Sequence, residues 1–155
     1  MLRATRGQQQ AQATKRTWNM VLFSVGGIKL AARTEDVGGI SPWTRSISVP
    51  SRTPFVHAML KRDHDVIPVY DLATRLSRTL QGDPLLCLVA RHLDGPMAIC
   101  IDAEVPSLET VDVVAIRPSG SEDIETLGMV TIGGEDVAIV ALQRLGRSRP
   151  DVVKS

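Results

Sequence analysis

The densest group of residues that could bind a metal ion lies in the segment HAMLKRDHD. It contains His57 and His64 together with Asp63 and Asp65. Imidazole nitrogens and carboxylate oxygens are common ligands of divalent cations, so such a group could hold one. The more ordinary interpretation is the tip of a β-hairpin, where charged side chains remain in water. We therefore expect no metal site here.

Other reactive side chains do not form a catalytic set in the sequence. Asp102 ends the apolar run ICIDAEV, where an aspartate more often fixes a turn than acts as a base. The acids of SEDIE, Glu122, Asp123 and Glu125, indicate an exposed loop. No GxSxG, P-loop, GxGxxG or CxxC pattern is present, and no nucleophile stands beside a base. The sequence therefore predicts a protein that is not an enzyme and binds no cofactor.

The two cysteines, Cys87 and Cys100, both lie in apolar, strand-like runs. Two buried thiols in a cytoplasmic protein are the simpler interpretation, and a disulfide stays an alternative that nothing in the sequence requires. The N-terminal segment is rich in Gln and basic residues and has no apolar core of the kind found in a secretory signal. We therefore expect a cytoplasmic location.

The composition is that of a soluble globular protein. Of the 155 residues, 43% are hydrophobic and 23% charged, and no apolar run approaches the ~18 residues of a membrane span. Aromatic residues make up only 3%, so the core must consist mostly of Val, Ile, Leu, Ala and Met. This length suits one domain, or two small subdomains that share a core.

Basic residues gather at both ends of the chain. Residues 1–17 carry four basic side chains and no acid, and residues 144–155 carry four with one acid, although the net charge is only +1. Basic ends can bind nucleic acid or an anionic membrane, but solvated tails are more common. We expect residues 1–17 and 146–155 to be disordered tails around a folded domain of residues 18–145.

Strand patterns dominate this domain. Gly26-Gly27 separates NMVLFSV from IKLAA, and Gly133-Gly134 separates GMVTI from EDVAIVALQRL. Glycine pairs adopt the positive φ angles that two-residue hairpins need. Asp94-Gly95 predicts a third hairpin. Short further strands are expected at residues 37–40, 47–49, 55–60 and 111–116. Many short strands at close spacing favour two small β-barrels, with the junction near residue 83.

The segment VIPVYDL combines an apolar strand with a proline. Pro68 has no amide hydrogen to donate, so this strand is expected at a sheet edge or beside a bulge. Leu72, Leu76 and Leu80 then recur at the spacing of a short amphipathic helix. Asp71 stands where its carboxylate could cap that helix, a contact worth ~1 kcal/mol. Capping is the better interpretation of Asp71 than catalysis.

The order of these segments resembles the CheW-like domain, the coupling module of bacterial chemotaxis arrays. The most specific match is the hydrophobic-Pro-hydrophobic-hydrophobic-Asp-Leu pattern at residues 67–72, followed by the strand that ends in Ile101 and Asp102. The resemblance extends from about Met20 to Leu145. The matching segments are VLFSVGGIKLAA, DVGGI, TPFVHAML, VIPVYDL, MAICIDAEVPSL, AIRPSG and LGMVTIGGEDVAIVALQRL.

The resemblance implies two five-stranded SH3-like β-barrels on a common core, with one or two short helices. The first barrel would span about residues 20–82 and the second about 83–145, with the terminal strands open to exchange. It further implies a non-catalytic adaptor without cofactors. Its partners would be the regulatory domain of a CheA-family histidine kinase and the cytoplasmic tips of methyl-accepting chemoreceptors, whose arrays would hold the protein near the membrane.

The resemblance also implies which residues contact each partner. Val37 and Ile40 match a segment used for kinase docking, whereas Phe55, Met59 and Arg62 lie on a segment that flanks the receptor-facing groove. Val37 and Phe55 are equally well explained as core residues. Arg62 stands near acids and is expected to be exposed.

Four departures from the family pattern leave alternatives open. The family's Asn-Leu-Arg-Gly turn is replaced by residues 60–65, its Val-x-Glu-Ile segment lacks the acid at residues 37–40, and alanines replace a glycine at Ala58 and an arginine at Ala73. One alternative is a divergent paralogue that binds only one of the two partners. Another is a small-barrel nucleic-acid-binding module, although five aromatic residues offer few stacking surfaces.

Overall fold

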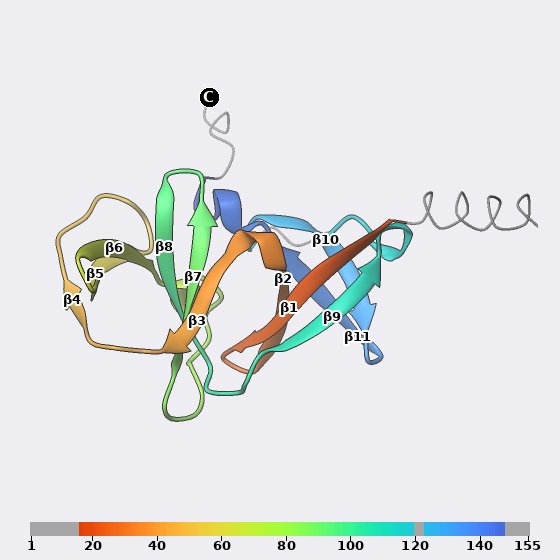
Figure 1. Cartoon of the computed structure of the whole chain (residues 1–155), viewed down its shortest axis with the longest axis horizontal. Helices are drawn as coiled ribbons and strands as arrows, with labels where there is room; N and C mark the ends of the chain where they lie inside the picture. Colours follow the sequence, from red (N-terminus) through yellow and green to blue (C-terminus); the bar gives the residue numbers. More distant parts are fainter. Residues whose placement is uncertain (1–15, 120–122, 148–155) are drawn as a thin grey trace, which may run out of the picture.

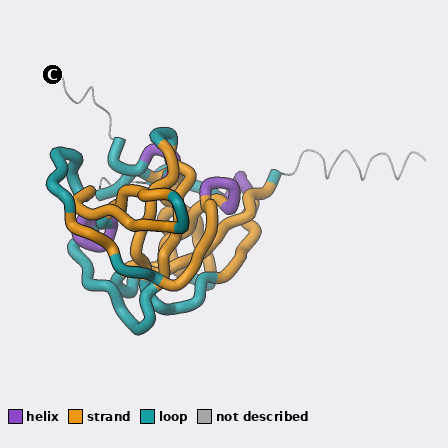
Figure 2. The backbone as a smooth tube through the Cα atoms, turned by 60° about the vertical axis from the view of Figure 1, so that its left-hand side comes forward, coloured by secondary structure: helices purple, strands orange, loops and turns teal. Residues whose placement is uncertain are grey.

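The chain forms two curved β-sheets that lie beside each other in the computed structural model, which describes residues 16–119 and 123–147 (Figure 1). The five-stranded sheet has the order β10-β11-β2-β1-β9, and the six-stranded sheet has the order β3-β7-β8-β6-β5-β4. Strands make up most of the backbone and the helical segments are short (Figure 2), which confirms the predicted mostly β fold.

The strands of each sheet and the helical segments have the following bounds. The strands of the five-stranded sheet are β1 (Thr17–Val25), β2 (Ile28–Arg33), β9 (Ser107–Asp112), β10 (Thr126–Ile132) and β11 (Glu135–Val140). Those of the six-stranded sheet are β3 (Val37–Pro42), β4 (Ser46–Ser48), β5 (Val56–Arg62), β6 (Asp65–Tyr70), β7 (Leu86–His92) and β8 (Gly95–Ile101). The helical elements are α2 (Leu72–Arg75) and the 3₁₀ turns η1 (Thr34–Asp36), η2 (Val113–Ala115) and η3 (Leu142–Arg144).

The two sheets are not consecutive halves of the chain. The five-stranded sheet combines both ends of the folded region, because β11 runs parallel to β2 with Ala138 opposite Leu30. The six-stranded sheet lies between them in sequence, so the expected junction near residue 83 falls inside it, in the link between α2 and β7. Strands pair across that point, β7 with β3 and β8 with β6, so the two sheets exchange strands between residues 20–82 and 83–145.

Three apolar clusters make up the core. One lies within each sheet, and the largest lies between the sheets, where β1 and β2 pack against β7, β8 and α2. Arg117 pairs with Met129 of β10 beyond the end of β9 and so draws the five-stranded sheet toward a closed barrel. The buried side chains of the cluster between the sheets include Phe23, Leu30, Tyr70, Leu72, Leu88, Ile99, Ile101, Val140, Leu142 and Leu145.

Both glycine-glycine hairpins form as predicted. Gly26 and Gly27 have φ angles of 59° and 85°, and Gly133 and Gly134 have 60° and 82°, each pair joining two adjacent antiparallel strands. These values are those of a two-residue turn with left-handed central residues.

Asp102 fixes the first of these hairpins, as its position at a strand end indicates. Its buried carboxylate accepts hydrogen bonds from the backbone amides of Gly26 and Gly27, both at 2.8 Å. It accepts a third from the amide of Gln81 at 2.9 Å. Because Asp102 follows β8, one side chain ties the end of the six-stranded sheet to a turn of the other sheet.

Asp71 caps α2. Its Oδ1 accepts a hydrogen bond from the backbone amide of Thr74 at 3.1 Å, and its Oδ2 accepts one from the Thr74 hydroxyl at 2.7 Å. These are the contacts of an N-cap aspartate.

The helix is shorter than the leucine spacing predicts. It ends at Arg75 instead of extending to Leu80. Ser77 takes a left-handed φ of 58°, and the amide of Arg78 donates to the carbonyl of Ala73 at 2.8 Å. This pattern is a Schellman motif, which satisfies the last helical carbonyls and turns the chain away. Leu80 therefore packs on the core from a loop.

Pro68 lies beside a bulge, and not at a sheet edge. Its strand, β6, lies between β5 and β8. The register of β5 shifts between Val56 and Ala58, close to the pair of Met59 with Pro68. A bulge is one of the settings in which a strand proline is tolerated.

Two element boundaries differ from the expected ones. Residues 111–116 do not form one strand, because β9 ends at Asp112, whose side chain caps η2 by accepting a hydrogen bond from the amide of Val114. At the C-terminal end, Gly146 and Arg147 belong to the ordered part of the chain, and Arg147 pairs with Asp94 at 3.6 Å. The rest of the two expected tails, residues 1–15 and 148–155, lies outside the described residues. Among those described, no helix has the length and apolar character needed to cross a bilayer.

Candidate functional site

A groove of about 240 Å³ lies between the two halves of the molecule. One wall comes from the six-stranded sheet and the loop before β5, and the other from the segment that follows η3. Its centre is mostly apolar and its rim is charged, an arrangement typical of protein-binding surfaces. The groove is lined by Thr53, Val56, Pro68, Tyr70, His92, Asp94, Met97, Leu145, Gly146 and Arg147.

An apolar row, exposed at Ile47 and half-buried at Met59 and Pro68, extends this groove over the outer face of the six-stranded sheet. Ile47 of β4 stands opposite Met59 of β5, which in turn stands opposite Pro68 of β6. Leu60 is buried, so its neighbour Met59 points to the other side of the sheet. Ile47 is 61% exposed, and Val66, also outside the core, is 57% exposed. We call Ile47, Met59 and Pro68 the outer row.

Phe55 packs behind one wall of the groove and does not form part of its surface. It is a non-glycine residue with a φ of 62°, and its half-buried ring packs on the core with its centroid 6.0 Å from that of Tyr70. The Arg75 guanidinium lies 6.0 Å from the Phe55 ring centroid. The structure therefore places Phe55 as a support for the loop that forms one wall.

Strand β3 forms a second surface, at an edge of the six-stranded sheet. It pairs only with β7, and from Gly38 to Pro42 its residues are exposed. Ile40 is 36% exposed, whereas Val37 packs against the core between the sheets. An edge strand presents unpaired amides and carbonyls to a partner. Of the two residues expected on this strand, Ile40 is available for contact and Val37 serves mainly to anchor the strand.

A buried carboxylate fixes the beginning of β3. Asp36 is almost fully buried and accepts a hydrogen bond from the Gln143 side-chain amide at 2.8 Å. Burial raises the pKa of Asp36, and the Gln143 hydrogen bond opposes that rise. Since Gln143 belongs to η3, the edge strand is tied to the C-terminal part of the five-stranded half.

Arg62 is exposed, as expected, but it adjoins β3 rather than the groove. It ends β5 and lines a hollow together with Ser41 and Pro42 of β3. At about 3.3 Å per residue, the strand separates Arg62 from the groove residue Val56 by about 20 Å. The expected set of Phe55, Met59 and Arg62 is thus spread over three environments.

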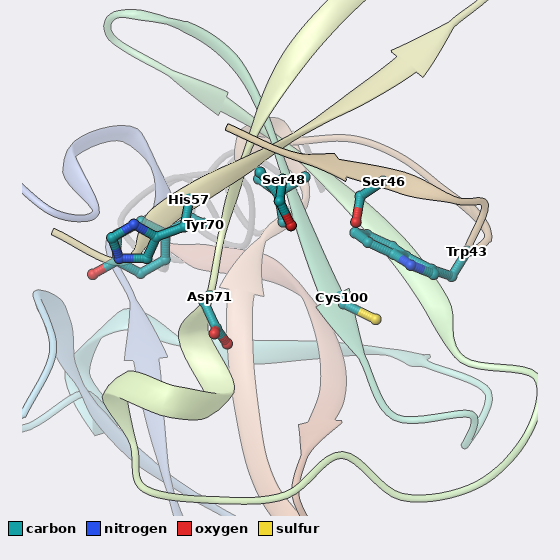
Figure 3. A pocket seen from close by; sticks show the side chains of 9 residues that line it. Trp43, Ser46, Ser48, His57, Tyr70, Asp71 and Cys100 are labelled. Carbon is teal, nitrogen blue, oxygen red and sulfur yellow. The ribbon is translucent and has the colours of Figure 1, made fainter. Parts of the chain in front are cut away.

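The histidines and acids near residue 60 do not converge. His64 lies with Asp63 at the tip of the β5–β6 hairpin, and His57 lines a separate hollow of about 290 Å³ (Figure 3). Within residues 16–119 and 123–147, His, Cys, Asp and Glu form no group of three that could hold a metal. Asp63, His64 and Asp65 lie at or beside the hairpin tip, as expected, whereas His57 lies near the other end of β5.

The cysteines stand directly opposite each other on β7 and β8, and both are free thiols. Cys100 lines the hollow in Figure 3 beside the indole of Trp43. Burial raises the pKa of both thiols, that of Cys100 to about 12. Protonated thiols are poor nucleophiles, so this pair is suited to packing rather than covalent chemistry.

The structure contains a buried ion pair beneath the groove that the sequence does not predict. Glu125, expected on an exposed loop, is buried and pairs with Arg75 at 2.6 Å. Desolvation alone would lower the pKa of Arg75, but hydrogen bonds to Glu125 and Tyr70 outweigh it, so its pKa is raised. Burial also raises the pKa of the Tyr70 hydroxyl. Nothing in the local pattern around SEDIE indicates this partner, 50 residues away.

These surfaces can be compared with known proteins. The family model of the CheW-like domain matches residues 19–149, which is most of the chain. The chain belongs to the CheW-like domain family. The CheW-like fold also appears in the crystal structure of the scaffolding protein TtCheW from Thermoanaerobacter tengcongensis, with a TM-score of 0.73 and 17% sequence identity. The match covers 83% of this chain and 87% of TtCheW. No curated protein matches the sequence.

Membership in the CheW-like family supports a scaffold or adaptor role in chemotaxis. The groove with its outer row and the β3 edge are the two surfaces on which such a role can be built. They lie on different elements of one connected core, so two partners could be held in a fixed relative geometry.

Proposed function

We propose that this protein is a non-catalytic adaptor that joins the cytoplasmic tip of a methyl-accepting chemoreceptor to the regulatory domain of a CheA-family histidine kinase. The observation that supports the proposal is the presence of two separate surfaces, an apolar groove and an exposed strand edge, on one CheW-like body. A scaffold needs such separation, because a single surface would make its partners compete.

The groove between the sheets is the proposed receptor site. Val56, Met97 and Leu145 give it an apolar centre, with Asp94 and Arg147 at the rim. An amphipathic helix laid into an apolar groove is a common mode of peptide recognition. The outer row lengthens the apolar surface along which such a helix could lie.

The β3 edge is the proposed kinase site. Ile40 supplies an exposed apolar contact, and the strand's free backbone groups supply hydrogen bonds. Arg62 adjoins this edge, so we assign it to the kinase surface rather than to the receptor groove. An arginine at an interface can contribute at least ~2 kcal/mol even where its effect on folding is small.

The aromatic residues do not favour nucleic-acid binding. Phe23 and Tyr70 are buried, and Phe55 and Trp43 pack against core clusters. Arg33 covers the face of Trp18 at 4.3 Å from the ring centroid. Bases would therefore find no open row of stacking surfaces, which single-strand binding by small barrels normally uses.

The two surfaces can be tested separately by placing a charge on each. Ile47→Glu should weaken binding of a receptor-tip fragment at least tenfold and leave kinase binding within twofold. Ile40→Glu should do the reverse. Val114→Glu is the matched control, because Val114 is 87% exposed and lies on neither surface. Isothermal titration calorimetry with each purified partner gives the affinities.

Two results would change the account. If the unaltered protein binds only the receptor tip or only the kinase domain, it is a one-partner paralogue, and the altered turn at residues 60–65 is the first place to look for the reason. If it binds neither, the adaptor proposal is wrong.

A further inference from the structure

The buried ion pair beneath the groove connects the two halves of the molecule. Arg75 extends from α2, which follows β6 of the six-stranded sheet, and Glu125 comes directly before β10 of the five-stranded sheet. The contact is bidentate, with Nη1–Oε1 and Nη2–Oε2 distances of 2.6 and 3.2 Å. The side chains are only 14% and 6% exposed.

Each member of the pair also holds one wall of the groove. Arg75 Nη1 donates a second hydrogen bond to the Tyr70 hydroxyl at 2.7 Å. Glu125 Oε1 accepts a hydrogen bond from the backbone amide of Gly146 at 3.0 Å. Tyr70 and Gly146 both line the groove, one from each side.

The two walls also touch each other at this point. A Cβ on Gly146 would stand 2.9 Å from the Tyr70 ring, and Gly146 has a φ of 82°. The close approach and the left-handed backbone both require glycine. Any shift of Arg75 relative to Glu125 would therefore move the two walls apart or together.

A buried pair of this kind is better suited to fixing the relative orientation of two elements than to stabilising the fold. Desolvating a carboxylate and a guanidinium offsets most of their attraction, so apolar side chains of similar size often stabilise a core as well or better. A guanidinium-carboxylate fork instead fixes direction as well as distance. Neither Arg75 nor Glu125 lines the groove.

We propose that Arg75 and Glu125 are positioning residues that set the relative orientation of the two sheets, and through it the affinity of the groove for a helical receptor tip. The binding half of this inference rests on the proposed function, whereas the orientation half does not. Tyr70, Gly146 and the supporting ring of Phe55 are the side chains and backbone through which the pair acts.

The orientation half is tested without any partner. Residual dipolar couplings of backbone amides report the relative orientation of the two sheets in solution. The unaltered protein should fit one alignment tensor for both sheets, and Glu125→Gln should require two tensors or a changed orientation. Arg75→Lys, which keeps the charge but loses the bidentate fork, provides a second variant if Glu125→Gln does not fold.

The matched control is the exposed ion pair between Arg117 and Asp136. It has a similar distance of 2.8 Å, but its side chains are 46% and 61% exposed and it lies within the five-stranded half. Arg117→Lys should leave both the couplings and the affinities unchanged.

The binding half uses calorimetry at a temperature where circular dichroism shows each variant folded. Glu125→Gln and Arg75→Lys should each lower the affinity for the receptor-tip fragment at least tenfold. The affinity for the kinase regulatory domain should stay within twofold of the unaltered protein's. A merely structural role would lower the melting temperature without this split between partners.

The outcomes separate the inference from the proposed function. Unchanged couplings in both variants overturn the inference, and so does a changed orientation with unchanged receptor affinity. If the unaltered protein fails to bind the receptor tip, the proposed function fails and the binding half falls with it. The couplings then still decide whether the pair sets the orientation.

Discussion

The two glycine-glycine hairpins have the same turn chemistry and different surroundings. The turn at Gly26-Gly27 is held by Asp102 and by Arg78, whose guanidinium donates to the Gly26 carbonyl at 2.6 and 2.9 Å. Apart from its own neighbours in the chain, no heavy atom of residues 16–119 and 123–147 lies within 4 Å of where a Cβ would stand on Gly133 or Gly134. One hairpin is part of the joint between the sheets, and the other is only a turn.

The glycine-glycine motif predicts the backbone conformation of both turns, but not how much each turn contributes to stability. Gly26 is required twice, by its φ angle and by the close approach of Arg78. Gly133 is required only by its φ angle. Substitutions at the two hairpins should therefore differ in magnitude although their local conformations agree.

The largest expected effect is at Asp102. Asp102→Ala leaves three amides without the carboxylate, those of Gly26, Gly27 and Gln81, at the contact between the sheets. Leaving a buried donor unpaired costs ~1–3 kcal/mol, and two of these three hydrogen bonds are only partly buried. We therefore expect a loss of about 3–5 kcal/mol in the free energy of unfolding. Urea denaturation measures it. A loss under about 1 kcal/mol would show that the joint does not depend on this carboxylate.

The next effect is at Gly26. A Cβ there would stand 2.3 Å from the Cβ of Arg78, and the left-handed φ adds strain. Gly26→Ala should lower the free energy of unfolding by about 2–4 kcal/mol, from overpacking plus backbone strain. The same denaturation series gives the value.

Gly133→Ala is the matched substitution in the free hairpin. Its φ of 60° is equally unfavourable for alanine, but no neighbour resists the added carbon. We expect a loss of only ~1 kcal/mol. Equal losses at Gly26 and Gly133 would contradict the distinction between the hairpins.

The smallest expected effect is on the pH dependence of stability, and it should have the same sign at both hairpins. Hydrogen bonds from Lys29 and Ser24 lower the pKa of Glu104 beside the first hairpin, and those from Thr131 and Arg117 lower that of Asp136 beside the second. A lowered folded-state pKa adds stability above the unfolded pKa, which is lost as the pH falls through the folded value. Glu104→Gln and Asp136→Asn should each slightly flatten the acid side of the stability profile. A steeper acid side would contradict this sign.

Local sequence was sufficient wherever local chemistry decides the structure. The glycine pairs predict both hairpins, Asp71 predicts a helix cap, and Asp102 at a strand end predicts a fixed turn. The leucine spacing predicts too long a helix, because it does not reveal the left-handed conformation of Ser77.

The long-range pairing follows from no local pattern, and only the family resemblance leaves the terminal strands open to exchange. The parallel contact of β11 with β2 brings both ends of the folded region into one sheet, and no local pattern encodes that choice. The sequence predicts an exposed loop for Glu125 because acids usually are exposed, and only the tertiary fold shows Arg75 beside it. The resemblance implies a place for Arg62 beside the groove, but β5 carries it to the β3 side.

The measurement that bears most directly on the adaptor role is simultaneous binding. Analytical ultracentrifugation of the protein with a receptor-tip fragment and a kinase regulatory domain should give one complex that contains all three. Saturating the groove with the receptor fragment should leave kinase affinity within a few fold. Mutually exclusive binding, in which each partner displaces the other, would contradict the account of two separate docking surfaces.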